Sequence, residues 1–245
     1  MSRELIYLTW IDVKNYLEEG VDTIILPVGC IEAHGPHLPL ATDVLIPLSI
    51  AQFLAPKINA LIAPPIFYGV VRSLSPYPGS ISISPQTLKE TIKSVLFSLR
   101  QSGFKYFIII NGHGSRDHLS ALKEACRESW LENKCVTILI NWWEVAEKIA
   151  EELFSSKPGH AGVDETSMIL TINEKLVKKR ELESEIITPK PGIEIFPSPG
   201  SIISDVEKYS IPSMEDVEKF KLKVLNEILT YVSLVLSKYR EKHFI

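Results

Sequence analysis

The chain has 245 residues, of which 45% are apolar and 23% are charged, and its formal net charge at pH 7 is −4. This length and composition are typical of a globular enzyme with a large buried core, and we expect one domain spanning residues 1–245. The weakly acidic charge, with no cluster of Lys and Arg, argues against nucleic acid as a partner.

The N-terminal segment and the cysteines indicate a cytoplasmic protein. The first ten residues, MSRELIYLTW, lack the apolar core of a signal peptide. No uninterrupted apolar run approaches the ~18 residues of a membrane span, so we expect no membrane partner. Cys30, Cys126 and Cys135 are odd in number and have no CxxC spacing, which predicts neither a disulfide framework nor a thiolate metal site.

Helical and strand-like segments alternate along the chain. Thr9 and Ser84 are predicted N-caps, Pro85 suits a first helical position, and Ser213 with Asp216 predicts a capping box. In chain order we predict a helix over 9–20, a strand over 21–29, a helix over 42–55, a strand over 59–69, a helix over 84–103, a strand and glycine-rich turn over 105–114, a helix over 115–133, a strand over 134–141, and helices over 143–154, from about 164 and from 213.

Continuous apolar strands that alternate with helices predict a mostly parallel sheet covered on both faces, which is a three-layer αβα fold. Residues 181–212 are rich in proline, glycine and serine. We interpret them as an irregular excursion of the same domain, because the single helix that follows is too short to form a domain of its own.

Polar side chains follow three of the predicted strands. Glu32 and His34 come after IILPVG, His113 after YFIIIN, and Asn141 and Trp142 complete VTILINW. Ligands of open parallel sheets bind beyond the carboxyl ends of the strands, so we expect these side chains to converge. Glu32 and His34 are two residues apart, and in extended backbone they project to the same side.

The chemistry of this group favours a metal site, although single residues also have structural explanations. Asp43 and Thr42 are both good N-cap residues, so one caps the next helix while the other turns inward. His113 alone is equally consistent with a core histidine bonded to backbone. Glu32 is harder to explain structurally, because an unpaired buried carboxylate is costly. Imidazole with carboxylate favours zinc, manganese or iron, and the absence of thiolate argues against a structural zinc site.

A third cluster is the segment GHAGVDETS. His160 lies in a glycine-bracketed loop and Glu165 in the first turn of the next helix, where a solvated loop histidine and a favourable helix-terminal charge are the structural explanations. Together with the other clusters they become candidates for a proton carrier and a metal ligand. We interpret His37 as bracing the loop, His118 as exposed or packed on a helix, and His243 as having no role.

Three stretches, "VGCIEAHGPHLPLATD", "NGHG" and "HAGVDETS", resemble in order the signature blocks of the creatininase (creatinine amidohydrolase) family. The first follows the family pattern G-S-x-E-Q-H-G-P-H-L-P-L-x-T-D over nearly its whole length. The resemblance covers about residues 5–205. It implies an α/β fold, a homohexamer, and hydrolysis of non-peptide C–N bonds in cyclic amides or formamides by water activated at two divalent zinc, manganese or iron ions.

The resemblance also implies roles for individual residues. Asp43 falls on the carboxylate that bridges the two ions, and His160 falls on the catalytic histidine, which we expect to protonate the leaving nitrogen. Creatininase itself has a metal-binding glutamate two residues after the NGH histidine, where this chain has Ser115, so Glu165 is our candidate for that ligand. The candidate metal ligands are Glu32, His34, Asp43, His113 and Glu165.

The partner we expect is a small flat heterocyclic amide or formamide, and two features bear on which one. The stretch "GVVRSLSPYPGSIS" resembles a family segment S-x-E-H-x-x-F-P-G-T, with Leu74 and Tyr77 in place of its histidine and phenylalanine. These changes argue against a standard creatinine or ribotide specificity. Trp142, or its neighbour Trp143, is our candidate for stacking on the substrate, with core packing and interface anchoring equally open for this pair.

Three alternatives remain. One is the specific activity of a formamidopyrimidine ribotide deformylase of flavin and deazaflavin biosynthesis. A second is a non-catalytic metal-binding scaffold, against which His160 within HAG favours an enzyme. A third is a serine or cysteine hydrolase, but no GxSxG motif is present, and we assign Cys30 to packing.

Overall fold

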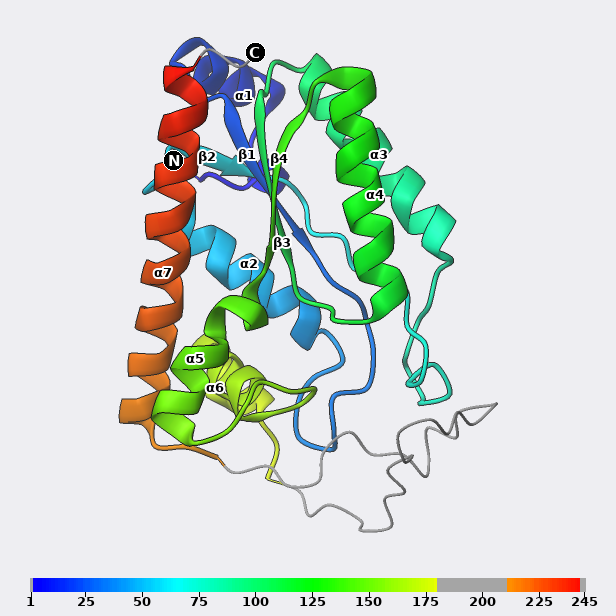
Figure 1. Cartoon of the computed structure of the whole chain (residues 1–245), viewed down its shortest axis with the longest axis vertical. Coiled ribbons are helices and arrows are strands. Elements are labelled where there is room, and N and C mark those ends of the chain that lie inside the picture. Colours follow the sequence, from blue (N-terminus) through cyan, green and yellow to red (C-terminus); the bar gives the residue numbers. More distant parts are fainter. Residues whose placement is uncertain (1, 180–210, 243–245) are drawn as a thin grey trace.

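A computed structural model describes residues 2–179 and 211–242. Four parallel strands form a sheet in the order β2-β1-β3-β4, and helices cover both faces (Figure 1), which confirms the predicted α/β fold. The elements are η1 (Leu5–Tyr7), α1 (Trp10–Glu18), β1 (Thr23–Val28), α2 (Thr42–Leu54), β2 (Ala60–Ile62), α3 (Pro85–Gln101), β3 (Tyr106–Asn111), α4 (Arg116–Asn133), β4 (Val136–Asn141), α5 (Trp142–Phe154), α6 (Val163–Asn173), η2 (Glu174–Leu176) and α7 (Met214–Glu241).

The two faces of the sheet bury two separate apolar cores, because successive side chains of a strand point to opposite faces. In β3, Ile108 and Ile110 pack with α2, α5, α6 and α7, while Phe107 and Ile109 pack with α3 and α4 on the other face. The unbroken apolar sequence of β1 and β3 therefore reflects burial on both sides, as the sequence predicted.

Side chains at the helix starts explain where several helices begin. Thr9 caps α1 in a capping box with Asp12, and Ser84 caps α3 by accepting a hydrogen bond from the Thr87 N–H, with Pro85 in the first turn. Ser213 caps α7 by accepting from the Asp216 N–H at 3.2 Å. The cap predicted for α2 is wrong, because Thr42 and Asp43 both lie inside that helix and Ala41 precedes it.

The predicted strand over 59–69 is only partly formed. β2 ends at Ile62, and Pro64 and Pro65 follow it. Proline has no N–H to donate, so the ladder does not continue through them. The chain touches β1 once more through an isolated bridge between Ile66 and Val28, and then enters the loop that contains Val70.

Within the described ranges, no helix combines the length and apolarity that a membrane crossing requires. Of the predicted irregular connection over 181–212, only the last two positions belong to the described residues. His243 also lies outside them.

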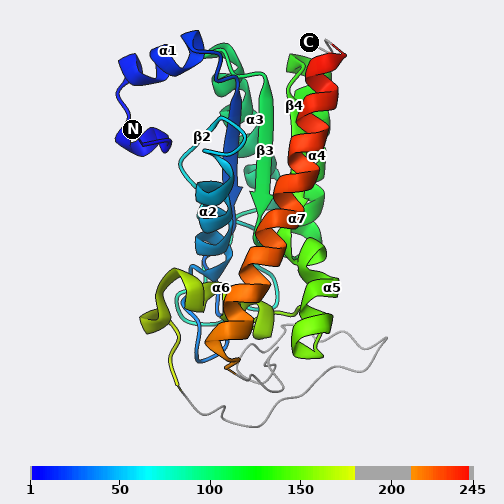
Figure 2. The same cartoon turned by 90° about the vertical axis from the view of Figure 1, so that its left-hand side faces the viewer.

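The carboxyl ends of the strands point toward the end of the molecule that carries α5 and α6, away from α1 (Figure 2). At this end two glycines let α2 approach the sheet closely. A Cβ at Gly29, after β1, or at Gly112, after β3, would overlap the backbone carbonyl of Asp43. Both glycines are therefore needed to place Asp43 between the ends of the two central strands.

This close approach predicts that Gly112→Ala is costly. The added methyl group must push α2 away from β3, and overpacking of this kind typically destabilises by about 1–3 kcal/mol. Urea unfolding measures the decrease in the free energy of unfolding. The matched control is Gly159→Ala, where a Cβ meets nothing within 4 Å, and a loss of equal size in that variant would contradict the packing explanation.

Candidate active site

A cavity of about 350 Å³ lies at the carboxyl ends of the strands. Segments between Glu32 and Glu165 contribute to it, because parallel strands deliver their following loops to one edge of the sheet. Its wall includes the cationic Arg72 and the aromatic Trp143. Four candidate metal ligands line it, namely Glu32, Asp43, His113 and Glu165.

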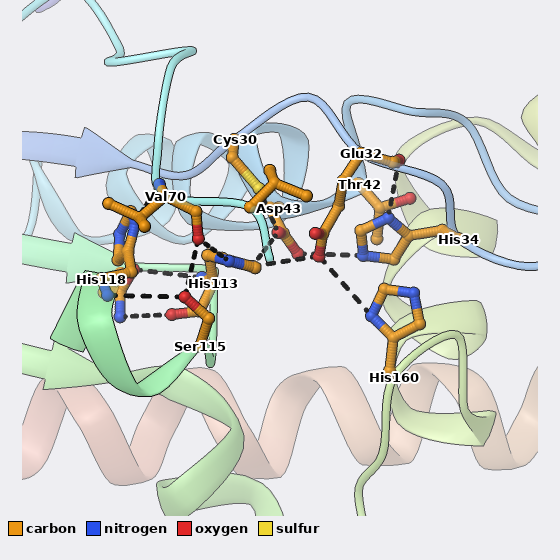
Figure 3. Close-up of polar contacts among 12 residues, drawn as sticks. Cys30, Glu32, His34, Thr42, Asp43, Val70, His113, Ser115, His118 and His160 are labelled. Carbon is orange, nitrogen blue, oxygen red and sulfur yellow. Dashed lines mark hydrogen bonds and ion pairs between the residues drawn. The ribbon is translucent and has the colours of Figure 1, made fainter. Parts of the chain in front are cut away.

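Asp43 lies at the centre of the polar cluster (Figure 3). Its Oδ1 is 3.0 Å from His34 Nε2, and its Oδ2 is 2.9 Å from His113 Nδ1. Glu165 Oε2 is 3.7 Å from the same His34 nitrogen, and Glu32 Oε1 is 3.0 Å from the same His113 nitrogen. Three overlapping groups of possible metal ligands lie in the described chain. Two of them share Asp43, with one of its oxygens facing each group, and the third consists of Glu32, His34 and His160.

Three histidines of the site are held in the same way. Each has one ring nitrogen at hydrogen-bonding distance from a backbone carbonyl, to which it donates, so the other nitrogen faces the carboxylates. The carbonyl bonds are His34 Nδ1 to Glu32 O at 3.1 Å, His113 Nε2 to Val70 O at 3.0 Å, and His160 Nε2 to Ala33 O at 2.7 Å.

The electrostatics of the cluster follow from its burial. Burial by itself lowers the pKa of His34, but the carboxylates of Asp43 and Glu165 outweigh it and raise the pKa to about 10. The pKa of His113 is raised well above its usual value, because burial, which lowers it, is outweighed by hydrogen bonds with Asp43, Cys30 and Glu32. Burial acts to raise the pKa of Asp43, and the two histidines hold it well below its ordinary value.

These pKa shifts indicate that the buried carboxylates need positive charge beside them. Glu32, Asp43 and Glu165 are all buried, and protonated imidazoles supply positive charge beside them. Burial, together with the charges of Asp164 and Asp43, nevertheless raises the pKa of Glu165 well above its usual value. Divalent ions would supply the same charge at the same nitrogens and displace the protons. Two imidazoles and three carboxylates are also the ligand types that zinc, manganese and iron accept. The residues present therefore fit a pair of divalent ions.

A polar network behind His113 fixes its ring. The Val70 carbonyl accepts from His113 Nε2 and, at 2.7 Å, from the Ser115 hydroxyl. The Val70 N–H donates to His118 Nδ1 at 3.3 Å, and His118 Nε2 donates to Asn111 Oδ1 at 3.1 Å. The prediction that His118 is exposed or merely helix-packing is therefore wrong. Burial lowers the pKa of His118 to about 3, so it stays neutral and can accept at Nδ1.

The other predicted residues lie at different distances from the cavity. His160 lies on the cavity wall, half-buried, with Nδ1 3.7 Å from Glu32 Oε1 and its ring centroid 4.2 Å from that of His34. His37 is buried away from the cavity, and its Nε2 lies 3.0 Å from the Thr166 hydroxyl of α6. This contact ties the loop to α6, in keeping with the bracing role we expected.

The choice of Trp142 as the substrate-stacking residue is corrected by the structure. Trp142 is 0% exposed and packs in the core with α7, while its neighbour Trp143 lines the cavity. Successive residues of a helix point about 100° apart, so only one of an adjacent pair can face the site. At the sequence level nothing distinguished the two, because the start of α5 was uncertain by one residue.

Asp164 is a site residue that sequence reasoning did not identify. It is buried, lines the cavity, and accepts from the Gly159 N–H at 3.1 Å, so it fixes the turn that carries His160. Burial raises its pKa to about 6. Its neighbour Glu165 accepts from the Ala161 N–H at 2.6 Å in the same turn. The two adjacent acids at the start of a helix are the sequence feature that could have identified Asp164.

A sequence model of the creatininase family, described as creatinine amidohydrolase, matches residues 7–214, so the chain belongs to the creatininase family. This family membership makes the protein a hydrolase. The chain is 27% identical to the creatinine amidohydrolase of Pseudomonas putida over 206 residues, which are 78% of this chain and 79% of that protein. It is 32% identical to the mycofactocin precursor peptide peptidase of Mycolicibacterium smegmatis over 178 residues, which are 69% of this chain and 65% of that protein.

Solved structures show the same fold. The crystal structure of a creatininase superposes with a TM-score of 0.82 at 24% sequence identity, covering 95% of this chain and 97% of that chain. Other solved creatininases include a mutant described as a Zn-Zn type and a manganese form, each with a TM-score of 0.78.

Proposed function

We propose that this protein is a metal-dependent amidohydrolase that holds two divalent ions per chain and cleaves a non-peptide C–N bond in a cyclic amide or formamide. The observation that carries the proposal is the pair of donor groups that share Asp43, beside His160 on the wall of one cavity. The zinc and manganese forms of solved creatininases support these two metals as candidates.

The cavity suits a small substrate. Its volume of about 350 Å³ is at the lower end of the range for small-molecule sites. Trp143 offers an aromatic face and Leu74 an apolar contact, which together favour a flat ring. Among the relatives, the name of the Pseudomonas putida protein specifies a cyclic amide, whereas the mycofactocin relative is named a peptidase. The size of the cavity favours the first kind of substrate.

Amide hydrolysis needs a better nucleophile than neutral water and a polarised carbonyl, both of which bound divalent ions supply. The protein's own residues must then protonate the leaving nitrogen. The bond from His160 Nε2 to the Ala33 carbonyl directs Nδ1 toward the cavity, near Glu32. Because His160 is half-buried on the wall, it can exchange a proton with solvent between turnovers, and we assign it this transfer.

Elemental analysis after reconstitution should find two divalent ions per chain. Asp43→Ala removes the residue shared by both donor groups and should lose both ions, whereas Glu165→Ala should lose only the ion beside His34. The matched control is Ser115→Ala, at the position where creatininase has its glutamate. It should retain both ions, because His113 keeps its bond to the Val70 carbonyl. Equal metal content in wild type and Asp43→Ala would refute the shared-ligand arrangement.

His160→Ala should retain both ions and lose activity by about 10²–10⁴-fold, the usual size of a lost acid–base group. The assay supplies the metal-loaded protein with a panel of cyclic amides, formamides and short peptides, and measures released amine or formate. Loss of metal in this variant as readily as in Asp43→Ala would make His160 a ligand instead.

The panel also tests the alternatives, since turnover of a formamide ribotide favours the deformylase and no turnover of any compound favours the scaffold.

We also propose a homo-oligomer, with a hexamer as the state that the family resemblance implies. Tyr7 and Trp10 at the N-terminal end and Tyr231 and Leu234 on α7 are more than half exposed, and burying such side chains between copies is favourable. Light scattering at micromolar concentration measures the mass, and a monomeric mass would end this proposal.

A further inference from the structure

Cys30 is the member of the polar cluster that the proposed function does not use. It follows β1 and is 0% exposed. Its Sγ is 3.1 Å from Asp43 Oδ2, the same oxygen that faces His113 Nδ1. The sulfur therefore shares the donor group formed by Glu32, Asp43 and His113, and the four ligand atoms all lie within 4.8 Å of one another.

The spacing of these atoms suits a tetrahedral ion. Bonds of about 2.0–2.3 Å to a tetrahedral ion place neighbouring ligand atoms about 3.3–3.7 Å apart. The recorded separations are 2.9 Å from His113 Nδ1 to Asp43 Oδ2, 3.0 Å from His113 Nδ1 to Glu32 Oε1, and 3.1 Å from Cys30 Sγ to Asp43 Oδ2. These three separations are a few tenths of an ångström shorter than the tetrahedral values, and all four ligand atoms lie within 4.8 Å of one another.

The surroundings of Cys30 keep the sulfur in place. The backbone of Gly69 packs so closely that a Cβ there would lie 2.9 Å from Cys30 Cβ. On the sulfur side are Asp43 and the His113 ring, whose own orientation is fixed by Val70. A packing role alone does not require a sulfur atom at this point, since any small apolar side chain would fill the space.

We propose that Cys30 Sγ is a direct ligand of the ion held by Glu32, Asp43 and His113, and that this ligand makes the position select zinc over manganese. The inference rests on the proposed metal site. When the ion binds, a sulfur–metal bond forms and the thiol proton passes to solvent, so no oxidant or reductant is needed. Thiolate is a soft ligand that favours zinc, whereas manganese prefers oxygen ligands.

The competing role for Cys30 is a hydrogen bond from the thiol to Asp43 Oδ2, with no bond to the ion. The substitution Cys30→Ser separates the two roles. A serine hydroxyl keeps the donor to Asp43 but is a much poorer ligand than a thiolate. The hydrogen-bond role predicts an unchanged metal site in Cys30→Ser, and the ligand role predicts a changed one.

The test is cobalt(II) substitution of the full-length protein, read by absorption and by elemental analysis. Wild type should show a near-ultraviolet sulfur-to-cobalt charge-transfer band, and Cys30→Ser should lose the band while it still contains cobalt at the other position. Cys126→Ser, which alters a half-buried cysteine of α4, is the matched control and should keep the band. In competition between zinc and manganese, the preference for zinc should fall in Cys30→Ser by more than about 10–100-fold. That range is the usual cost of losing a residue that only hydrogen-bonds to a metal ligand.

Cobalt bound to wild type without the band would overturn the role of Cys30 and leave the proposed function standing. Failure to bind any divalent ion would overturn both. If Cys30→Ser does not fold, the variant with Cys126→Ser and Cys135→Ser decides the matter, because Cys30 is then the sole cysteine of the chain. Its band must persist for the proposal to hold.

Discussion

The site depends on one electrostatic constraint, which is that two buried carboxylates, those of Glu32 and Glu165, each lie within 4.8 Å of the buried carboxylate of Asp43. Glu32, Asp43 and Glu165 would repel one another and lose hydration at great cost without positive charge beside them. His34 and His113 supply that positive charge when they are protonated, and the pKa of each is accordingly raised. A cluster in which protons occupy ligand nitrogens is well suited to exchange them for divalent ions.

The fold makes this arrangement possible through backbone contacts more than through side-chain packing. Gly29 and Gly112 bring the start of α2 against the ends of β1 and β3, and Asp43 is thereby held between the two donor groups. The carbonyls of Glu32, Ala33 and Val70 then orient the three histidines. Because these carbonyls belong to loops crossing the same edge of the sheet, the ring orientations and the sheet topology are determined together.

Most of the fold was predictable from the sequence because it depends on local patterns. Double-sided burial of β1 and β3 gives unbroken apolar runs, and caps such as Thr9 and Ser84 mark helix starts. The convergence of Glu32, His34, Asp43, His113 and Glu165 was predictable from motif position. Their exact partition into two groups was not, since it depends on which oxygen of Asp43 faces which histidine.

The features that sequence reasoning missed depend on tertiary contacts. His118 has the spacing of an ordinary helical residue, and only its approach to Val70 and Asn111 makes it part of the network. Trp142 and Trp143 differ by one step of a helix whose start was uncertain. Thr42 has the chemistry of a cap, but its hydroxyl donates to the Pro39 carbonyl at 2.7 Å instead, and the helix begins one residue earlier than a capping role requires.

The central proposal is that two ions share Asp43 as a ligand, and anomalous X-ray diffraction from crystals of the reconstituted protein tests it most directly. The account predicts two metal peaks about 3.5–4 Å apart, the usual separation in two-metal sites. Asp43 should lie between them, with His113 and Glu32 on one ion and His34 and Glu165 on the other. A single peak, or two peaks of which only one contacts Asp43, would contradict the account.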